Sequence, residues 1–130
     1  LETPLTIIPI AGDALAVDTF ENISAWIQAV KAKGVGQVAV IGPHYLNFNS
    51  GGDTVNTEQS LWASVRVAHK AAALAEGAEY VDTYAYMRAL ILSGDVAQGD
   101  WAIWHQGATN THMTPNGEAV LADAIRAAIF

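Results

Sequence analysis

The sequence predicts an α/β fold in which helices cover both faces of a small parallel sheet, a three-layer α/β/α arrangement. Short apolar runs, typical of strands buried on both faces, alternate with amphipathic stretches that carry helix start and stop signals. The expected order is strand, helix, strand, helix, strand, helix, loop, helix, with no internal repeat or low-complexity linker. At 130 residues, 52% of them hydrophobic and 15% charged, positions 1–130 have the size and composition of one globular domain.

The first strand and helix have clear boundaries. The run "LTIIPI" at residues 5–10 is apolar throughout and ends at Gly12, so it predicts a buried strand. Asp18 and Glu21 have the spacing of a capping box, and an apolar stripe at helical spacing follows them. Gly34 is the expected stop of this helix.

Two further strands flank a long helix. Residues 37–42, "QVAVIG", predict a second buried strand that Pro43 ends. A polar, glycine-containing loop is expected over residues 43–56, and a helix over about 56–76. The short run "AEYVD" at residues 78–82 predicts the third strand.

The last third of the chain contains two predicted helices with an irregular segment between them. The first helix covers residues 83–94, with Gly94 as its stop. Residues 95–113 show no period of either kind and are predicted to be irregular. Thr114 as N-cap and Pro115 at the first helical position predict the start of the final helix.

Charge and composition exclude several classes of protein. The 13 acidic residues outnumber 6 basic ones, which are scattered, so neither nucleic acid nor an anionic membrane surface is an expected partner. No apolar run approaches the roughly 18 residues of a membrane span. The opening "LETPLTIIPI" has no basic n-region, so a signal peptide is not expected. Without cysteine there is no disulfide, thiolate metal site or cysteine nucleophile.

Three segments resemble the C-terminal half of the SGNH (GDSL-type) hydrolases. They are "KAKGVGQVAVIGP", "AALAEGAEYVD" and "THMTPNGEAVLADAI", in the family's order. The last is the most specific, because it is similar to the family segment D-G-T-H-L-T-P-x-G-x-x-x-x-A-D, which carries the catalytic histidine. The resemblance implies a flavodoxin-like, three-layer domain or the C-terminal portion of one, and an ester hydrolase that needs no cofactor.

His112 matches the catalytic base of that family. An imidazole titrates near neutral pH, and a helix start on one side with a glycine loop on the other can aim it into a cleft. The family's aspartate, three residues before the histidine, orients the ring; Thr109 occupies that position, with Asn110 beside it. A hydroxyl or amide can hold the ring, but it stabilises an imidazolium less well than a carboxylate does.

The nucleophile segment of the family has two possible alignments with "AGDAL". In one, Ala14 replaces the nucleophilic serine of the G-D-S turn. In the other, which we prefer because a helix signal follows within ten residues, Gly12 and Asp13 belong to the turn after the third strand of the family. Gly12 then replaces an asparagine of the oxyanion hole, a loss of order 10²–10³ in rate in comparable sites.

The preferred alignment leaves the first two strands and the nucleophilic serine outside this chain, so the expected sheet is incomplete. An unpaired edge strand as apolar as residues 5–10 would tend to pair with a strand of another chain. We therefore expect a companion polypeptide to complete the sheet, unless the site is vestigial.

Polar and aromatic side chains near predicted strand ends are candidates for substrate contact. His44, Asn47 and Asn49 follow the second strand, where α/β folds bind ligands, although a solvated loop would have the same composition. Trp104 and His105 precede His112 and could form a wall on which a sugar stacks, or could pin the loop to the body.

Two functions remain open. The first is hydrolysis of acyl esters, such as acetyl esters of carbohydrate, with an ester or glycan as the substrate. The second is a non-catalytic module that binds glycan or serves in a surface or virion assembly. The spacing of His105 and His112 with Asp100 is too weak a pattern to predict a metal site.

Overall fold

The computed structural model describes residues 5–8, 20–48, 57–108 and 110–130. The strands are β1 (Leu5–Ile8), β2 (Gln37–Ile41), β3 (Glu79–Val81), β4 (His105–Gly107) and β5 (Asn110–Met113). The helices are α1 (Phe20–Lys31), α2 (Thr57–Ala75), α3 (Thr83–Leu92) and α4 (Pro115–Ile129), and Trp101–Ile103 form a 3₁₀ turn. The predicted mixture of helices and strands in an α/β fold is confirmed.

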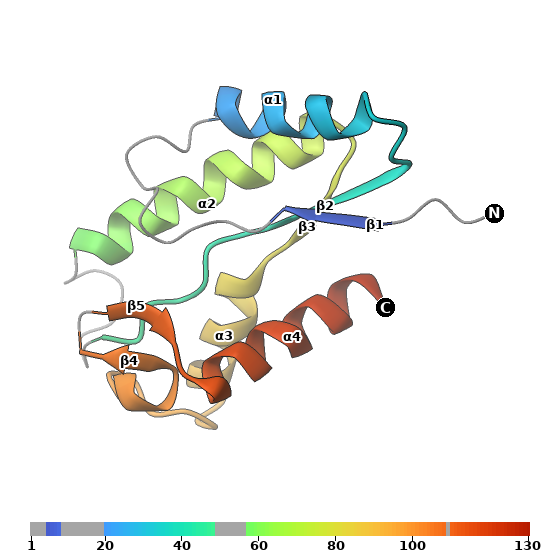
Figure 1. The fold of residues 1–130 in the computed structure, drawn as a ribbon. Helices are drawn as coiled ribbons and strands as arrows, with labels where there is room; N and C mark the ends of the chain where they lie inside the picture. The colour runs from blue at the N-terminus through green and yellow to red at the C-terminus, as the bar shows by residue number, and fades with distance from the viewer. Residues whose placement is uncertain (1–4, 9–19, 49–56, 109) are drawn as a thin grey trace.

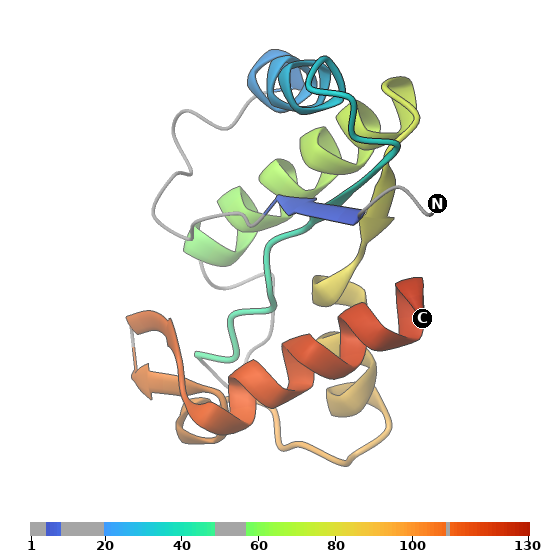
Figure 2. The ribbon, with the colours of Figure 1, turned by 45° about the vertical axis from the view of Figure 1, so that its right-hand side comes forward.

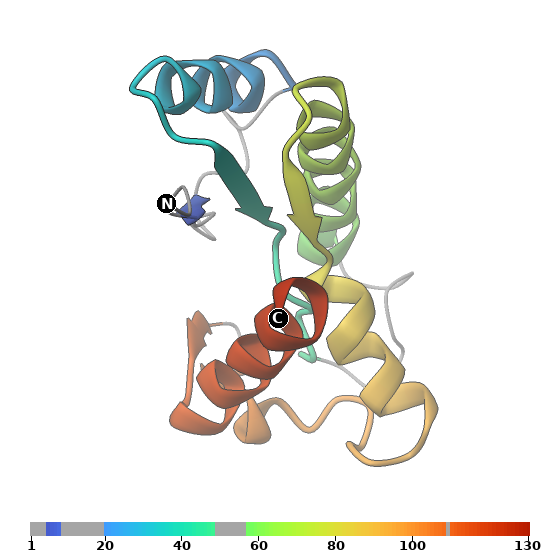
Figure 3. The ribbon, with the colours of Figure 1, turned by 90° about the vertical axis from the view of Figure 1, so that its right-hand side faces the viewer.

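The first three strands form a parallel sheet in the order β1-β2-β3. Ile7 pairs with Ala39, and Val40 pairs with Tyr80. Figure 3 shows β2 and β3 side by side and pointing the same way, so their carboxyl ends lie at the same edge of the sheet. The helices connect the parallel strands in sequence, which is the arrangement that the alternating pattern predicted.

The helices lie on two sides of this sheet. Figures 1 and 2 show α1 and α2 together on one side, and α3 and α4 on the other. A first apolar core fills the space between α1, α2 and β2, and its buried members are Ile23, Ile27, Val38, Val40, Ala72 and Ala73. The apolar stripe predicted for α1 therefore faces this core, because Ile23 and Ile27 lie one turn apart and are both fully buried.

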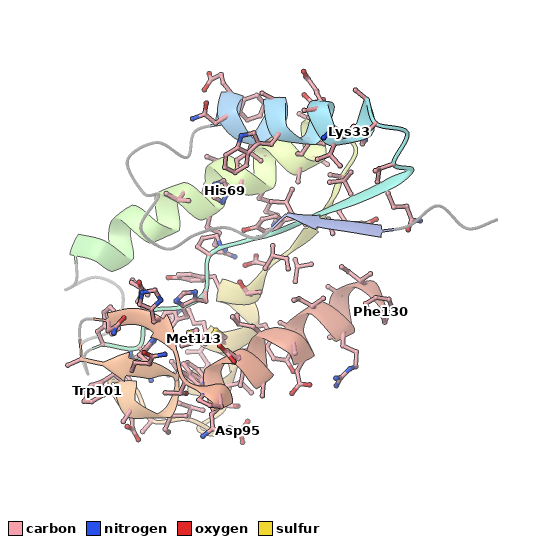
Figure 4. All side chains as sticks on the ribbon, viewed as in Figure 1. Lys33, His69, Asp95, Trp101, Met113 and Phe130 are labelled. Carbon is pink, nitrogen blue, oxygen red and sulfur yellow. The ribbon has the colours of Figure 1, made fainter. Side chains whose placement is uncertain are left out.

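A second core lies where the loop after β2, helix α3 and the β4–β5 hairpin meet. Its buried members are Tyr45, Leu46, Tyr84, Met87, Trp104 and Met113. Figure 4 places Trp101 and Met113 at this hairpin end of the molecule, and Phe130 at the far end of α4. These aromatic and sulfur-containing side chains come from segments that are far apart in the sequence, so this core fixes the hairpin relative to the sheet.

The helix boundaries agree with the sequence signals where the structure describes them. Gly34 and Gly94, the predicted stops, have φ angles of 84° and 85°, and Gly77, which follows the helix predicted over about 56–76, has a φ of 65°; L side chains rarely adopt such angles. Thr114 is the N-cap of α4, and its Oγ1 accepts a hydrogen bond from the backbone N–H of Gly117 at 3.2 Å. Asp18 and Asn56, the predicted starts of the first two helices, lie outside the described residues.

The prediction that residues 95–113 are irregular is wrong. β4 and β5 form an antiparallel hairpin in which His105 pairs with Met113 and Gly107 pairs with Asn110. The strands have only three and four residues and carry mostly polar side chains, so the alternation that identifies a half-buried strand is absent from them. The ladder is also irregular between His105 and Gly107.

No helix in the described part of the chain is both long enough and apolar enough to cross a membrane.

The first turn of α4 passes very close to the residue that ends the 3₁₀ turn. A Cβ atom on Gly117 would lie 2.5 Å from the carbonyl oxygen of Trp104 and 2.9 Å from the Cε of Met113. The carbonyl cannot move freely, because it accepts a hydrogen bond from the backbone N–H of Thr114 at 2.8 Å. Only glycine therefore fits at this position.

We expect Gly117→Ala to destabilise the protein by roughly 1–3 kcal/mol, the usual cost of overpacking. The sign of the change in stability is informative, because glycine to alanine in an unconstrained helix stabilises the helix by about 1 kcal/mol. Urea denaturation followed by circular dichroism measures the difference. Asn116→Ala, at the exposed neighbouring position, is the matched control and should change stability by less than about 0.5 kcal/mol. A more stable Gly117→Ala variant would contradict the close approach.

Candidate functional site

The loop after β2, residues 43–48, leads from the carboxyl end of the parallel sheet to the β4–β5 hairpin, as Figure 2 shows. The buried hydroxyl of Thr83 at the start of α3 donates to the carbonyl oxygens of Gly42 at 2.7 Å and Pro43 at 3.1 Å. A Cβ atom on Gly42 would overlap the hydroxyl of Tyr80, 2.0 Å away, so the chain leaves β2 against the ring of the neighbouring strand. The direction of the loop is therefore set by β3 and α3.

Asn47 joins this loop to two other segments from a fully buried position. Its backbone N–H donates to Nε2 of His105 at 3.2 Å. Its side-chain amide makes four hydrogen bonds to residues 97–100. The Nδ2 group donates to the carbonyl oxygens of Ala97 at 3.0 Å and Asp100 at 3.3 Å. The Oδ1 atom accepts from the backbone N–H of Gly99 at 2.7 Å and from Nε2 of Gln98 at 3.2 Å. Both ends of the buried amide are thus satisfied.

His105 is 1% exposed and is neutral near pH 7. Burial lowers its pKa to about 4, and the backbone of Tyr45 only partly opposes this effect. Because Nε2 accepts the hydrogen bond from Asn47, the single ring proton of the neutral form belongs on Nδ1. Phe48 packs edge-on against this ring with a centroid distance of 4.8 Å, so the loop and the hairpin share an aromatic contact.

His44 links the loop to β5, the strand that carries His112. Its ring centroid is 5.8 Å from that of His105. The pKa of His44 is lowered to about 4, chiefly by burial and also by the nearby His105, and a hydrogen bond to the backbone of Thr111 opposes both effects. His44 therefore holds the backbone next to His112.

His112 has an exposed side chain on a backbone that is fixed on both sides. Its own N–H donates to Oδ1 of Asn110 at 2.9 Å, a turn that asparagine commonly forms. Met113 and Thr114 follow, the first buried in the second core and the second capping α4. Asn110 thus holds the backbone of His112, whereas the sequence suggested that it could hold the ring.

Some of the residues expected to contact substrate are buried in the protein instead. Trp104 and His105 are each 1% exposed, and Trp104 packs in the second core, so their burial favours the alternative in which they pin the loop to the body over a sugar-stacking wall. Asn47 is also too deeply buried to touch a ligand, and it supports the loop instead. The sequence could not show this, because polar and aromatic residues near a strand end have the same composition in a binding loop and in a packed one.

The remaining predicted positions lie outside the described residues; they are Gly12, Asp13, Asn49 and Thr109. Over the four described ranges, no group of three histidine, aspartate or glutamate side chains is placed to hold a metal ion.

One ion pair was not predicted from the sequence. Arg66 of α2 donates to Asp82 through Nε at 2.8 Å and through Nη2 at 2.6 Å. Burial would raise the pKa of Asp82, but the hydrogen bonds from Arg66 and Ala85 outweigh it and lower that pKa. Asp82 also caps α3 by accepting from the N–H of Ala85. Only the position of Asp82 directly before a predicted helix hinted at this role.

No family model matches the sequence, and no curated protein matches it with significance.

The buried histidines predict a loss of stability in mild acid. A lowered folded-state pKa means that the unfolded chain binds protons first, so this stability is complete above about pH 6.5 and is lost progressively as the pH falls toward 4. Urea denaturation at pH 7 and pH 5 should show it, with part of the loss coming from His44 and from His69, whose pKa values burial also lowers to about 4.

His105→Gln isolates one contribution. Glutamine places an oxygen near the position of Nε2, so it can still accept from Asn47 but does not titrate. We expect the variant to lose about 1–2 kcal/mol less than the parent between pH 7 and pH 5. Between pH 7 and pH 8, where the imidazole is neutral in both states, the two proteins should change alike. If both proteins lost the same stability between pH 7 and pH 5, His105 would not be held neutral in the folded state.

Proposed function

We propose that this chain supplies the histidine-bearing part of an ester hydrolase of the SGNH type, acting on acyl esters of carbohydrate such as acetyl esters. The observation that carries the proposal is the placement of His112: an exposed imidazole on a backbone fixed by Asn110 and by the start of α4. His44 ties the adjacent Thr111 to the loop that leaves the carboxyl end of β2. Ligands bind at that end of the strands in α/β folds.

In the proposed reaction a serine hydroxyl attacks the acyl carbon of the ester, and His112 takes the hydroxyl proton. His112 returns this proton to the leaving sugar hydroxyl, which departs as the C–O bond breaks. It then takes a proton from water as the water attacks the acyl-enzyme, and returns it to the serine as the carboxylic acid leaves. The reaction needs no cofactor, and backbone donors near Gly12 would stabilise the oxyanion.

The serine would come from a companion polypeptide that completes the sheet. Within the described part of the chain, β1 is hydrogen-bonded to β2 alone, and no strand pairs with its other edge. An open parallel edge is a template for another strand. A strand added to β1 in the same direction would bring its carboxyl end to the edge from which the His44 loop leaves.

The alternative proposal is a non-catalytic module that binds glycan or takes part in an assembly. One observation favours it: among the described residues the imidazole of His112 has no carboxylate partner to stabilise its protonated form, and the Asn110 oxygen is engaged by the backbone. An assay must therefore distinguish a His112 that acts as a catalytic base from a His112 that has no catalytic role.

The expected outcome is that a serine-directed fluorophosphonate probe labels the native assembly on the companion polypeptide and does not label the isolated chain. Hydrolysis of p-nitrophenyl acetate by the assembly should fall by about 10²–10⁴-fold in His112→Ala, the usual contribution of a general base. Native mass spectrometry of the assembly identifies the companion.

Asn116→Ala, an exposed change four residues away, is the control and should retain full activity. Labelling of the isolated chain would contradict the companion, since it would place the nucleophile within these residues. An assembly that is neither labelled nor active would support the non-catalytic module.

A further inference from the structure

The first turn of α4 contains the only asparagine–glycine pair in the sequence, Asn116 followed by Gly117. In such a pair the backbone nitrogen of the glycine can attack Cγ of the asparagine, because glycine has no side chain to obstruct the approach. The Asn116 side chain is exposed, and the proposed hydrolase gives it no role. The pair is therefore a candidate site for a chemical change in the chain itself.

The reaction is a deamidation. The Gly117 nitrogen loses its proton and forms a bond to Cγ of Asn116, the bond from Cγ to the side-chain nitrogen breaks, and ammonia leaves. The resulting cyclic imide contains two carbonyl groups, and water opens the ring at either one. One opening gives aspartate at position 116, and the other gives isoaspartate, in which the backbone runs through the side chain. Water is the only co-reactant, and nothing is oxidised or reduced.

The N-cap of α4 opposes this reaction in the folded protein. Oγ1 of Thr114 accepts a hydrogen bond from the backbone N–H of Gly117 at 3.2 Å, and the same hydroxyl donates to the carbonyl oxygen of Ile103 at 2.8 Å. The attacking nitrogen thus keeps its proton in the cap. Asn116 is also helical, and closing the imide ring requires its ψ to rotate far from the helical value of about −42°.

The packing around Gly117 opposes the same rotation. Gly117 is buried, and a Cβ atom on it would lie 2.5 Å from the carbonyl oxygen of Trp104. The backbone N–H of Thr114 donates to that carbonyl at 2.8 Å, so the 3₁₀ turn and the start of α4 are held against each other. Rotation about Asn116 would displace Gly117 from this contact. The ring can therefore form only after the first turn of α4 has opened.

We propose that Asn116 is a latent deamidation site, and that opening of the first turn of α4 at the Thr114 cap controls the reaction. The aspartate product adds a negative charge at the second position of the helix, where the helix dipole favours it. The isoaspartate product adds a methylene to the backbone beside the Trp104 contact, so the turn can no longer close as before. The proposal stands independently of the hydrolase, since it involves neither the imidazole of His112 nor a companion polypeptide.

Incubation of the chain at pH 8, followed by tryptic digestion and tandem mass spectrometry, measures the rate of conversion at Asn116. The same chain unfolded in guanidinium chloride gives the rate of the open state. We expect the folded parent to convert about ten- to a thousandfold more slowly, since local opening must precede the reaction. This factor should be at least as large as the protection of the Gly117 amide in hydrogen exchange, because both processes need the cap to open.

Substitutions at Thr114 isolate the hydrogen bond of the cap. Thr114→Ala removes the hydroxyl and should speed conversion in the folded protein about fivefold, the factor by which loss of an N-cap favours opening. Thr114→Ser keeps the hydroxyl and should convert within about twofold of the parent rate. Arg126→Gln, the matched control, removes the ion pair with Asp123 near the other end of α4 and should leave the rate at Asn116 unchanged. Circular dichroism checks that each variant is folded.

Four results would overturn the proposal. Equal rates in the folded and unfolded parent would show that the first turn does not control the reaction. Equal rates in Thr114→Ala and the parent, or an equal acceleration in Arg126→Gln, would remove the role of the cap. No conversion of Thr114→Ala after about ten half-times of the unfolded chain would show that opening of this turn does not expose the pair. If the alanine variant does not fold, a parent that converts faster than the protection of its Gly117 amide allows would contradict the proposal by itself.

Discussion

The buried amide of Asn47 is the interaction on which the carboxyl end of the sheet depends. It lies in a loop without regular secondary structure, and its backbone and side chain contact segments that follow it by 50 to 58 residues. An unsatisfied amide in this position would cost about 1–3 kcal/mol per lost partner, so the loop after β2, residues 97–100 and His105 are constrained together. The hairpin that carries His112 is thereby fixed to the parallel sheet.

The two cores of the molecule differ in what they provide. The core between α1, α2 and β2 is built from aliphatic side chains and alanine, which pack without hydrogen-bond requirements. The core beneath the hairpin contains aromatic rings and borders on the amide of Asn47 and two neutral imidazoles. Polar groups of this kind require particular partners, so this core specifies where each segment lies. The exposed His112 is positioned by the second core, through Met113 and the hydrogen bond of His44 to the backbone of Thr111.

The sequence could predict the elements whose signals are local. Positive φ angles at Gly34, Gly77 and Gly94, and the cap at Thr114, are decided by neighbouring residues, and these boundaries are as expected. The hairpin was missed because its short polar strands are stabilised by contacts with distant segments. The burial of Trp104 was also beyond the local pattern, because the side chains that share the second core with it come from the loop after β2, from α3 and from β5.

The geometry of parallel strands sets what the proposed companion must provide. Neighbouring strands lie about 4.8 Å apart, so a strand added beyond β1 would end roughly 10 Å from the carboxyl end of β2. The loop that leaves β2 already extends toward the hairpin, and His44 reaches the backbone of Thr111. A serine on a tight turn after the added strand would lie at the same edge of the sheet as the loop that leaves β2. A general base must lie within about 3 Å of the hydroxyl that it deprotonates. The proposed companion is therefore best matched by a serine on the turn that directly follows its strand, because the opposite end of that strand would lie at the other edge of the sheet, away from the loop whose His44 contacts Thr111.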